Sequence, residues 1–278
     1  MAENQHERTK MLVGETALER IQRTRVAIFG VGGVGGYVAE ALARAGIGEI
    51  HLIDHDTVSV TNINRQIIAL HSTVGRYKVD VMRDRIADIN PEARVFTYPV
   101  FFEEETKREF DFASFDYVVD AIDSLSAKIE LIATAKAAGA KIISAMGAGN
   151  KLDPTAFKLT DISKTKVCPL ARAVRTRLKK RGIYHLDVVY SEELSSTTET
   201  VECTQNCDTS PDVSATTPYQ ASKTIDPTDT TPNQMEMTPT SAEKTPTRRA
   251  PASISFVPSA MGLVIAGAVV RNIIKAEK

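Results

Sequence analysis

The sequence predicts an α/β fold: a Rossmann-like, doubly wound and mainly parallel sheet with helices on both faces and a mixed C-terminal extension. Three observations support this prediction. Short β-rich runs alternate with helix-like segments along the first half of the chain, the first run stops at a glycine-rich turn, and hydrophobic residues make up 42% of the 278 residues. A chain of this length and composition can bury a large core.

The predicted elements follow one another in strand–helix alternation. Residues 1–24 form a polar lead-in that we expect to be helical, and RVAIFG is a β-rich run that ends at glycine. Apolar residues at 79, 82, 86 and 89 have helical spacing. In chain order, strands are predicted at 25–30, 49–54, 94–99, 115–120 and 141–145, and helices at 34–45, 78–89 and 127–138. Right-handed crossovers should place the carboxyl ends of these strands at one edge, where ligands bind.

The second half of the chain is less regular. Residues 151–190 are a mixed segment that contains a basic helix, and residues 191–250 are crowded with Thr, Ser and Pro. This composition predicts a long flexible insertion, because it offers too little apolar surface to offset the entropy of ordering. A last strand is predicted at 253–257 (SISFV) and a last helix at 261–276.

Composition excludes several classes of protein. The formal net charge of -1 excludes a chain that is basic throughout, so any nucleic-acid contact must use a local patch. Three Cys residues are no disulfide framework and favour a reducing cytoplasm. The polar N-terminus lacks a signal-peptide core, and the apolar stretch at 261–270 falls short of a membrane span.

The first predicted strand runs into a phosphate-binding type of turn. Gly30, Gly32, Gly33 and Gly35 allow a tight turn with close backbone approach, and the helix that follows offers free N–H groups to phosphate. Asp54 ends the next strand, where an acid can hold ribose hydroxyls. The pattern predicts a nucleotide but leaves open whether it is a dinucleotide or ATP.

A set of polar residues after the second strand favours ATP. A dinucleotide needs few cations beyond the glycine turn, whereas attack at the α-phosphorus of a triphosphate builds charge that cations must stabilise. Arg65 and Lys78 can supply that charge, and Asp123, at the same edge, suits Mg²⁺. The remaining members are Asp56, Asn62 and Gln66. The alternative for Arg65 and Lys78 is an ordinary surface charge and an ordinary helix lysine.

The motifs GVGGVG, LIDHDTV, TNINRQ, GRYK and DAIDS follow one another within residues 26–124. This set resembles the ubiquitin-activating-enzyme-like adenylyltransferase superfamily. Within it the chain is most similar to the tRNA threonylcarbamoyladenosine dehydratases, through runs such as INPEARV, GAGNKLDPTAFKLTDISKTKVCPLARAVRTRLKKRGI and SISFVPSAMGLVIAG. The likeness covers nearly the whole chain except about 191–250.

The resemblance implies a role for each of these residues. The four glycines would cradle ATP, Asp54 would bind its ribose, Asp123 would hold Mg²⁺, and Arg8 would reach into the site of a partner subunit in a homodimer. The phosphate contacts would come from Asn62, Arg65, Gln66 and Lys78, with Asp56 in the same nucleotide site. It also implies an ATP-binding region at 1–150 and a substrate and dimer extension of the same domain at 151–278. For Arg8, a solvated helix arginine is the alternative.

The implied chemistry is adenylation of the threonyl carboxylate of the modified adenosine beside the tRNA anticodon, followed by ring closure to an oxazolone-type base. The cofactors are ATP and Mg²⁺. The partners are tRNA and a second copy of the chain, with a cysteine desulfurase or sulfur acceptor as an open candidate.

A basic helix near the middle of the chain is a candidate tRNA contact. Six cations crowd ARAVRTRLKKRG, namely Arg172, Arg175, Arg177, Lys179, Lys180 and Arg181. Such a cluster suits an RNA backbone, where affinity comes mainly from phosphate contacts. A solvated helix face is the alternative.

Three other functions remain open from the sequence. An activator of a ubiquitin-like sulfur carrier would carry a groove for a Gly-Gly tail and a zinc site of two C-x-x-C pairs. Cys203 and Cys207 are four apart and Cys168 stands alone, so we expect no zinc. A dinucleotide-dependent oxidoreductase would have no use for Arg65 and Lys78, and a silent nucleotide-binding scaffold would not need the full polar set.

Overall fold

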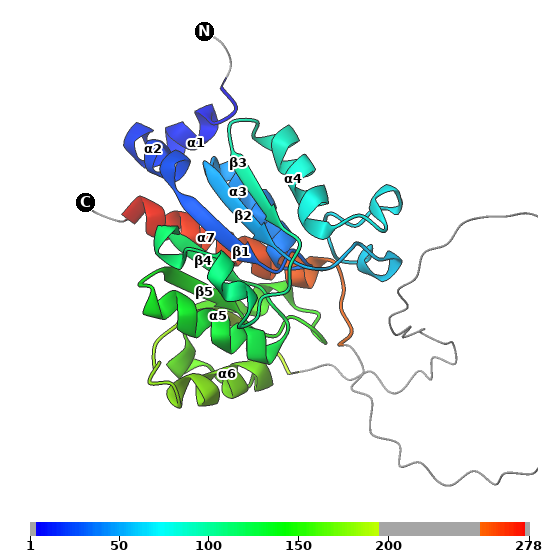
Figure 1. The fold of residues 1–278 in the computed structure, drawn as a ribbon, viewed down its shortest axis with the longest axis vertical. Coiled ribbons are helices and arrows are strands. Elements are labelled where there is room, and N and C mark those ends of the chain that lie inside the picture. The colour runs from blue at the N-terminus through cyan, green and yellow to red at the C-terminus, as the bar shows by residue number, and fades with distance from the viewer. Residues whose placement is uncertain (1–3, 195–250, 276–278) are drawn as a thin grey trace, which may run out of the picture. The chain divides into compact units, whose positions relative to one another are not determined.

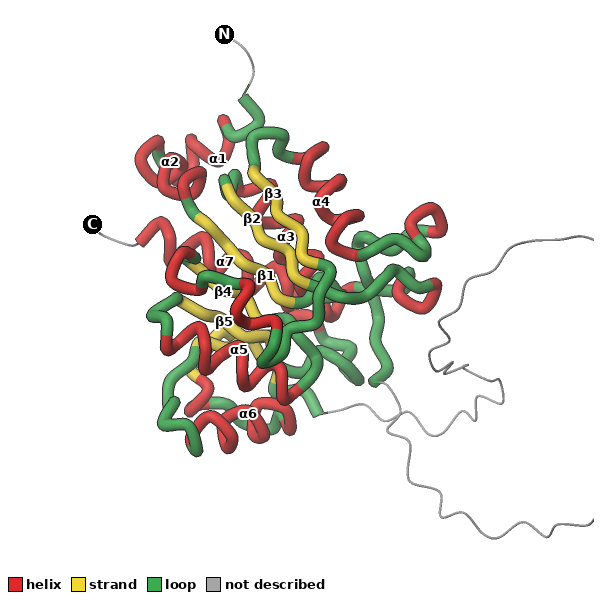
Figure 2. The backbone as a smooth tube through the Cα atoms, viewed as in Figure 1, coloured by secondary structure: helices red, strands yellow, loops and turns green. Residues whose placement is uncertain are grey.

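The described residues are built around a seven-stranded sheet with the strand order β3-β2-β1-β4-β5-β7-β6. Strands β1 to β5 are labelled in Figure 2. The computed structural model describes residues 4–194 and 251–275. All neighbouring strands are parallel except β6, which runs antiparallel to β7. The strands are β1 (Arg25–Phe29), β2 (Glu49–Ile53), β3 (Arg94–Tyr98), β4 (Tyr117–Asp120), β5 (Lys141–Ala145), β6 (Phe157–Asp161) and β7 (Asp187–Ser191). The α/β, mainly parallel fold predicted from the sequence is therefore confirmed.

Helices cover both faces of the sheet (Figure 1). The helices are α1 (Glu7–Val13), α2 (Glu15–Arg23), α3 (Gly35–Ala45), α4 (Lys78–Ile89), α5 (Leu125–Ala137), α6 (Pro169–Lys179) and α7 (Phe256–Lys275). Buried side chains of α3, α4 and α7 belong to one hydrophobic cluster, and those of α5 and α6 belong to a second. The predicted strands and helices of the first half agree with these bounds within a few residues.

Strand β1 shows why both clusters form. Val26 and Ile28 point into the cluster with α3 and α7, whereas Ala27 and Phe29 point into the cluster with α5. Because side chains alternate along a strand, a continuous apolar run buries both faces of a parallel sheet. All four residues are fully buried.

The predicted strand at 253–257 is wrong. Phe256 begins α7, and Val257 packs into the core with no exposed surface. Pro258 lies in the first turn of α7, where its missing N–H has no helical acceptor to lose. Residues 253–255 of SISFV precede α7, and only Phe256 and Val257 lie in its first turn, where Val257 joins the hydrophobic cluster of α3 and α4.

Helix α7 also meets the length and composition of a membrane span, and half of its most apolar window is buried inside the fold. It packs against α2 and α3, and a Cβ on Gly262 would lie 2.6 Å from the carbonyl oxygen of Val34. Fully buried Met261, Ile265 and Val269 give α7 a core-facing side. These contacts make α7 part of the protein's core.

The predicted insertion at 191–250 falls largely outside the described residues. Ser191 is the last residue of β7, and the chain is described as far as Leu194 and again from Pro251. Both flanks are fixed beside one loop: Lys151 Nζ donates to Glu193 O at 2.5 Å, and Asn150 N donates to Ala252 O at 2.8 Å. The division of the chain at residue 150 stays a prediction.

Candidate nucleotide site

The turn after β1 requires glycine at two positions. Gly30 has a φ of 90°, and a Cβ on it would lie 2.6 Å from the carbonyl oxygen of Ala121. A Cβ on Gly35 would lie 1.8 Å from the carbonyl oxygen of Gly30. The glycines thus let the end of β1, the start of α3 and the loop after β4 approach one another closely.

The glycine turn presents backbone donors at the carboxyl edge of the sheet. No partner among the described residues is found for the N–H groups of Gly32 and Gly33. Val31 N donates to Asp54 Oδ2 at 2.7 Å, which joins the turn to the end of β2. Asp54 Oδ1 accepts from Asp56 N at 2.9 Å. Asp54 is half-buried, so its remaining lone pairs can accept ribose hydroxyls beside the turn.

A short 3₁₀ helix, η1 (Val60–Asn62), places two further predicted residues over this turn. Asn62 is buried, its Oδ1 accepts from Ser59 N at 3.1 Å, and its carbonyl accepts from the N–H groups of Arg65 and Gln66. A Cβ on Gly33 would lie 3.5 Å from Arg65 Cγ. Asn62 therefore builds the loop that brings Arg65 beside the glycine turn.

Gln66 carries an unsatisfied buried atom that fits a ligand in this place. Gln66 is 7% exposed, and its Oε1 is buried without a hydrogen-bond partner among the described residues. Its Nε2 would lie 3.7 Å from a Cβ on Gly32. Buried polar groups are rarely left unpaired, and the two ends of an amide can exchange places. As drawn, Nε2 beside Gly32 can donate to an anionic group above the turn, whereas Oε1 needs a donor.

Lys78 is held in a fixed position at the start of α4. Its side chain is 7% exposed, and its ammonium lies 2.6 Å from Asp56 Oδ2. Lys78 N also donates to Asp56 O at 3.0 Å, which ties α4 to the segment after β2. Arg65 differs, because its guanidinium bonds to Thr61 O and Asn64 Oδ1 and meets no carboxylate among the described residues.

Asp123 follows β4 at the same edge. It is exposed, and its carboxylate has no partner among residues 4–194 and 251–275. A free carboxylate beside a phosphate-binding turn fits the oxygen ligands that Mg²⁺ prefers. Nucleotide and ion are both compatible with the residues gathered here, namely Gly30, Gly32, Gly33, Gly35, Asp54, Asp56, Asn62, Arg65, Gln66, Lys78 and Asp123.

Arg8 lies away from this site. It is an exposed residue of α1, which precedes α2 and so lies toward the amino end of β1 (Figure 1). Among the described residues it has no side-chain partner. Within one chain it therefore does not join the glycine turn, and any role there requires a second copy.

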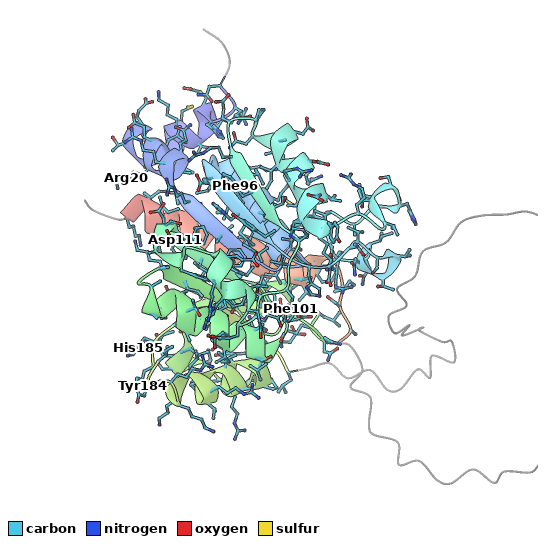
Figure 3. The ribbon with its side chains drawn as sticks, in the orientation of Figure 1. Arg20, Phe96, Phe101, Asp111, Tyr184 and His185 are labelled. Atoms are coloured by element: carbon cyan, nitrogen blue, oxygen red, sulfur yellow. The ribbon has the colours of Figure 1, made fainter. Side chains whose placement is uncertain are left out.

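The basic helix divides into two kinds of cation. Arg175 bonds to Ile162 O, Thr165 O and Thr165 Oγ1, and Arg181 pairs with Glu130 at 2.7 Å. These two arginines stabilise the fold. The other four, Arg172, Arg177, Lys179 and Lys180, are exposed and have no side-chain partner within the described part of the chain. Tyr184 projects beyond the end of α6 and is 56% exposed (Figure 3).

Sequence reasoning missed two features of the site. Pro258 at the start of α7 covers the turn, since its Cβ would lie 3.3 Å from a Cβ on Gly33. A buried pair of Asp120 and Lys128 lies behind the loop that carries Asp123. The signal for this pair was a lysine in the apolar run LSAKIELIATA. Cys168 is a buried free thiol, while Cys203 and Cys207 lie outside the described residues, so the expected absence of zinc stays a prediction.

The sheet, its glycine turn and the polar residues at its carboxyl edge define a nucleotide-binding protein of the ThiF class. The sequence model of the ThiF family matches residues 6–278, and the chain belongs to this family. The resemblance noted in the sequence is therefore confirmed at the level of the family.

Within the ThiF family, the chain is similar to proteins of one named activity. The chain is 48% identical over 191 residues to a tRNA threonylcarbamoyladenosine dehydratase of Bacillus subtilis, covering 68% of this chain and 75% of that protein. It is 42% identical over 193 residues to the Escherichia coli protein of the same name, covering 66% and 72%.

Solved structures of the E. coli dehydratase are also similar to this chain in fold. The crystal structure of the E. coli dehydratase in complex with ATP matches with a TM-score of 0.75 at 31% identity, covering 97% of this chain and 93% of that chain. Its complex with AMP matches with a TM-score of 0.74 at 31% identity, covering 95% and 92%.

Proposed function

We propose that this protein catalyses the ATP-dependent, cyclising dehydration of N6-threonylcarbamoyladenosine in tRNA. The observation that carries the proposal is the 48% identity with the B. subtilis dehydratase. The complexes of the E. coli enzyme with ATP and AMP support adenylate chemistry on this fold. The Gln66 Nε2 donor beside Gly32 and the fixed ammonium of Lys78 support a nucleotide at the glycine turn.

In the proposed reaction, the threonyl carboxylate of the modified adenosine attacks the α-phosphorus of ATP and pyrophosphate leaves. The carbamoyl group then closes onto the activated carbonyl, a proton is released, and AMP departs with one oxygen of the former carboxylate. ATP is thereby converted to AMP and pyrophosphate while the nucleoside loses one water. The nucleophile belongs to the substrate, so the protein's work is positioning and charge stabilisation.

Each part of the site has a role in this proposal. The amides of Gly32 and Gly33 and the side chain of Gln66 bind phosphate oxygens, and Asp54 binds the ribose. Lys78 and Arg65 stabilise the charge that builds on the phosphates as pyrophosphate leaves. Mg²⁺, held by Asp123, would screen the phosphate charges.

We infer that the four free cations of α6 contact tRNA. Cys168 is the N-cap of α6, and its Sγ would lie 3.7 Å from a Cβ on Gly147, just beyond the carboxyl end of β5. The helix then runs back along the sheet, so its basic face leads away from the nucleotide site. Phosphates of the anticodon stem-loop can pair with these cations while the modified base occupies the site.

We also infer a homodimer in which Arg8 serves the partner's site. Arg8 is exposed on α1 beside Met11 and Leu12, which are 79% and 86% exposed. A second copy would bury this apolar surface and could bring Arg8 to the phosphates of the other subunit. We expect the enzyme to act in the cytoplasm. A sulfur-transfer partner stays a prediction.

The proposal is tested by incubating the protein with ATP, Mg²⁺ and tRNA that carries threonylcarbamoyladenosine. AMP should be released in step with the loss of one water from the nucleoside, detected by mass spectrometry after digestion. Unmodified tRNA is the matched control and should release no AMP. Pyrophosphate exchange that depends on a ubiquitin-like carrier protein, with no change in the nucleoside, would contradict the proposal.

A further inference from the structure

A buried ion pair lies behind the carboxyl edge of the sheet, and the proposed reaction does not use it. Lys128 on α5 and Asp120 at the end of β4 have no exposed side-chain surface. The Lys128 ammonium lies 2.8 Å from each oxygen of the Asp120 carboxylate. Burying such a pair is costly, and apolar side chains of similar size often stabilise a fold as well or better. Stability alone therefore does not account for it.

The pair joins the ends of two neighbouring strands. Ser144 Oγ on β5 donates to Asp120 Oδ2 at 2.5 Å, and Lys128 Nζ donates to the carbonyl oxygen of Ala145 at 3.1 Å. Asp120 Oδ1 also accepts from the N–H of Ile122 at 3.2 Å. Every oxygen of the buried carboxylate is thus engaged, and the backbone after β4 is oriented by it.

The same backbone lies beneath the glycine turn. Ala121 N donates to Phe29 O at 2.8 Å, and the carbonyl oxygen of Ala121 is the atom that a Cβ on Gly30 would strike. Asp123 follows two residues later and starts the approach to α5. One buried network therefore fixes the segment that supports the phosphate turn and carries the candidate Mg²⁺ ligand.

We propose that Lys128 is a positioning residue for the adenylation site, acting through Asp120 on segment 121–123. Its ammonium holds the carboxylate, the carboxylate holds the Ile122 amide, and this sets where Asp123 stands relative to the glycine turn. Small displacements of a binding group away from the reacting atoms can lower a rate by up to about a hundredfold. The inference rests on the proposed function, because it assigns Asp123 to the nucleotide's metal ion.

The test replaces the polar network by apolar side chains of similar size, Asp120→Val, Lys128→Met and Ser144→Ala together. We expect the melting temperature to stay at or above that of the wild type. The Mg²⁺ concentration for half-maximal AMP release should rise about tenfold and kcat should fall about tenfold. Binding of ATP with Mn²⁺, followed by calorimetry and by the electron paramagnetic resonance of the bound ion, should weaken in parallel.

A matched control separates positioning from folding. Glu40→Gln with Arg85→Met removes another ion pair, which joins α3 to α4 at 2.6 Å. This variant should lose thermal stability and keep the wild-type Mg²⁺ requirement. If the triple variant binds Mn²⁺-ATP and turns over like the wild type, Lys128 has only a structural role.

Two further outcomes are decided by the same measurements. If the triple variant fails to fold, Ser144→Ala alone, which leaves the ion pair in place, should show about a twofold rise in the Mg²⁺ requirement, and no rise would overturn the inference. If the wild type does not cyclise the nucleoside, the proposed function fails. The Mn²⁺-ATP binding comparison would still decide the role of Lys128.

Discussion

The candidate nucleotide site at the carboxyl edge of the sheet and the basic face of α6 both carry positive charge, and they hold it in opposite ways. Lys78 is 7% exposed and fixed by Asp56 at 2.6 Å. Arg172 and Arg177 are exposed and have no side-chain partner among the described residues. A fixed charge needs no rearrangement when a transition state forms, whereas free charges suit phosphate contacts that release counterions. The comparison separates residues that should govern the chemical step from residues that should govern tRNA affinity.

The largest expected effect is the loss of turnover when a cation of the candidate nucleotide site is removed. Lys78→Ala and Arg65→Ala should each lower kcat by about two orders of magnitude, as for the loss of a transition-state charge. Asp56 is about half exposed, so in the Lys78→Ala variant water can solvate its carboxylate in place of the lysine. The free energy of unfolding should therefore change by about 1 kcal/mol or less. Steady-state AMP release and urea denaturation measure the two effects. Lys136→Ala, an exposed lysine of α5, is the control, and near-normal rates for Lys78→Ala and Arg65→Ala would remove the distinction between the two regions.

The proposed role of Arg8 would add a second subunit to the nucleotide site. Arg8→Ala should lower AMP release about tenfold. Mixing the Arg8→Ala and Lys78→Ala variants should restore about a quarter of wild-type activity. About half of the dimers in the mixture are heterodimers, and each heterodimer of a two-fold symmetric enzyme keeps one of its two sites intact. Activity of the mixture after co-refolding measures this. Sedimentation that shows a monomer, or a mixture no more active than its components, would contradict the proposal.

The free cations of α6 should affect a different quantity. Changing Arg172, Arg177, Lys179 and Lys180 together to Ala should raise the Kd for tRNA at least about tenfold. The slope of log Kd against log salt concentration should become shallower by an amount that corresponds to about three phosphate contacts. The KM for ATP should stay unchanged. Arg175→Ala is the matched control on the same helix, because its bonds to Thr165 predict a loss of stability and an unchanged salt slope. A quadruple variant with wild-type tRNA affinity would leave α6 as a solvated helix.

Local patterns predicted the parts of the molecule that local physics determines. The glycine turn between a strand and a helix was readable because the positive φ of Gly30 and the approach of Gly35 to the Gly30 carbonyl are set within a few residues. The predicted strand at 253–257 was wrong, because SISFV has strand-like alternation but pairs with no strand of the described sheet, and its last two residues begin α7. The sequence also did not predict which cations of the basic helix have partners within the fold. Nothing in ARAVRTRLKKRG shows that Arg175 meets Thr165 or that Arg181 meets Glu130.

The buried pair of Asp120 and Lys128 shows the same limit at the site itself. The sequence identified the strand and the loop residue Asp123, because apolar runs and terminal acids are visible in one dimension. It did not identify what orients that loop, since Lys128 reaches Asp120 and the end of β5 only after α5 has packed on the sheet. Residues at the carboxyl ends of strands are therefore easier to nominate from the sequence than the buried residues that orient them.

The ion pairs of Glu40 with Arg44 and Arg85 belong neither to the nucleotide site nor to the basic face of α6. Their removal should have the smallest effect of the changes considered, and on stability alone. Burial would raise the pKa of Glu40, but hydrogen bonds from Arg85 and Arg44 outweigh it and hold that pKa below its usual value. A carboxyl group with a lowered folded-state pKa stabilises the protein above its unfolded pKa of about 4.3, and this contribution is lost as the pH falls through the folded value. Glu40→Gln should thus lower the free energy of unfolding by about 1–2 kcal/mol at neutral pH. The difference from wild type should shrink as urea denaturation is repeated toward pH 3, while kcat at neutral pH stays unchanged. A difference that persists at low pH would mean that Glu40 stabilises the α3–α4 contact through packing and not through its charge.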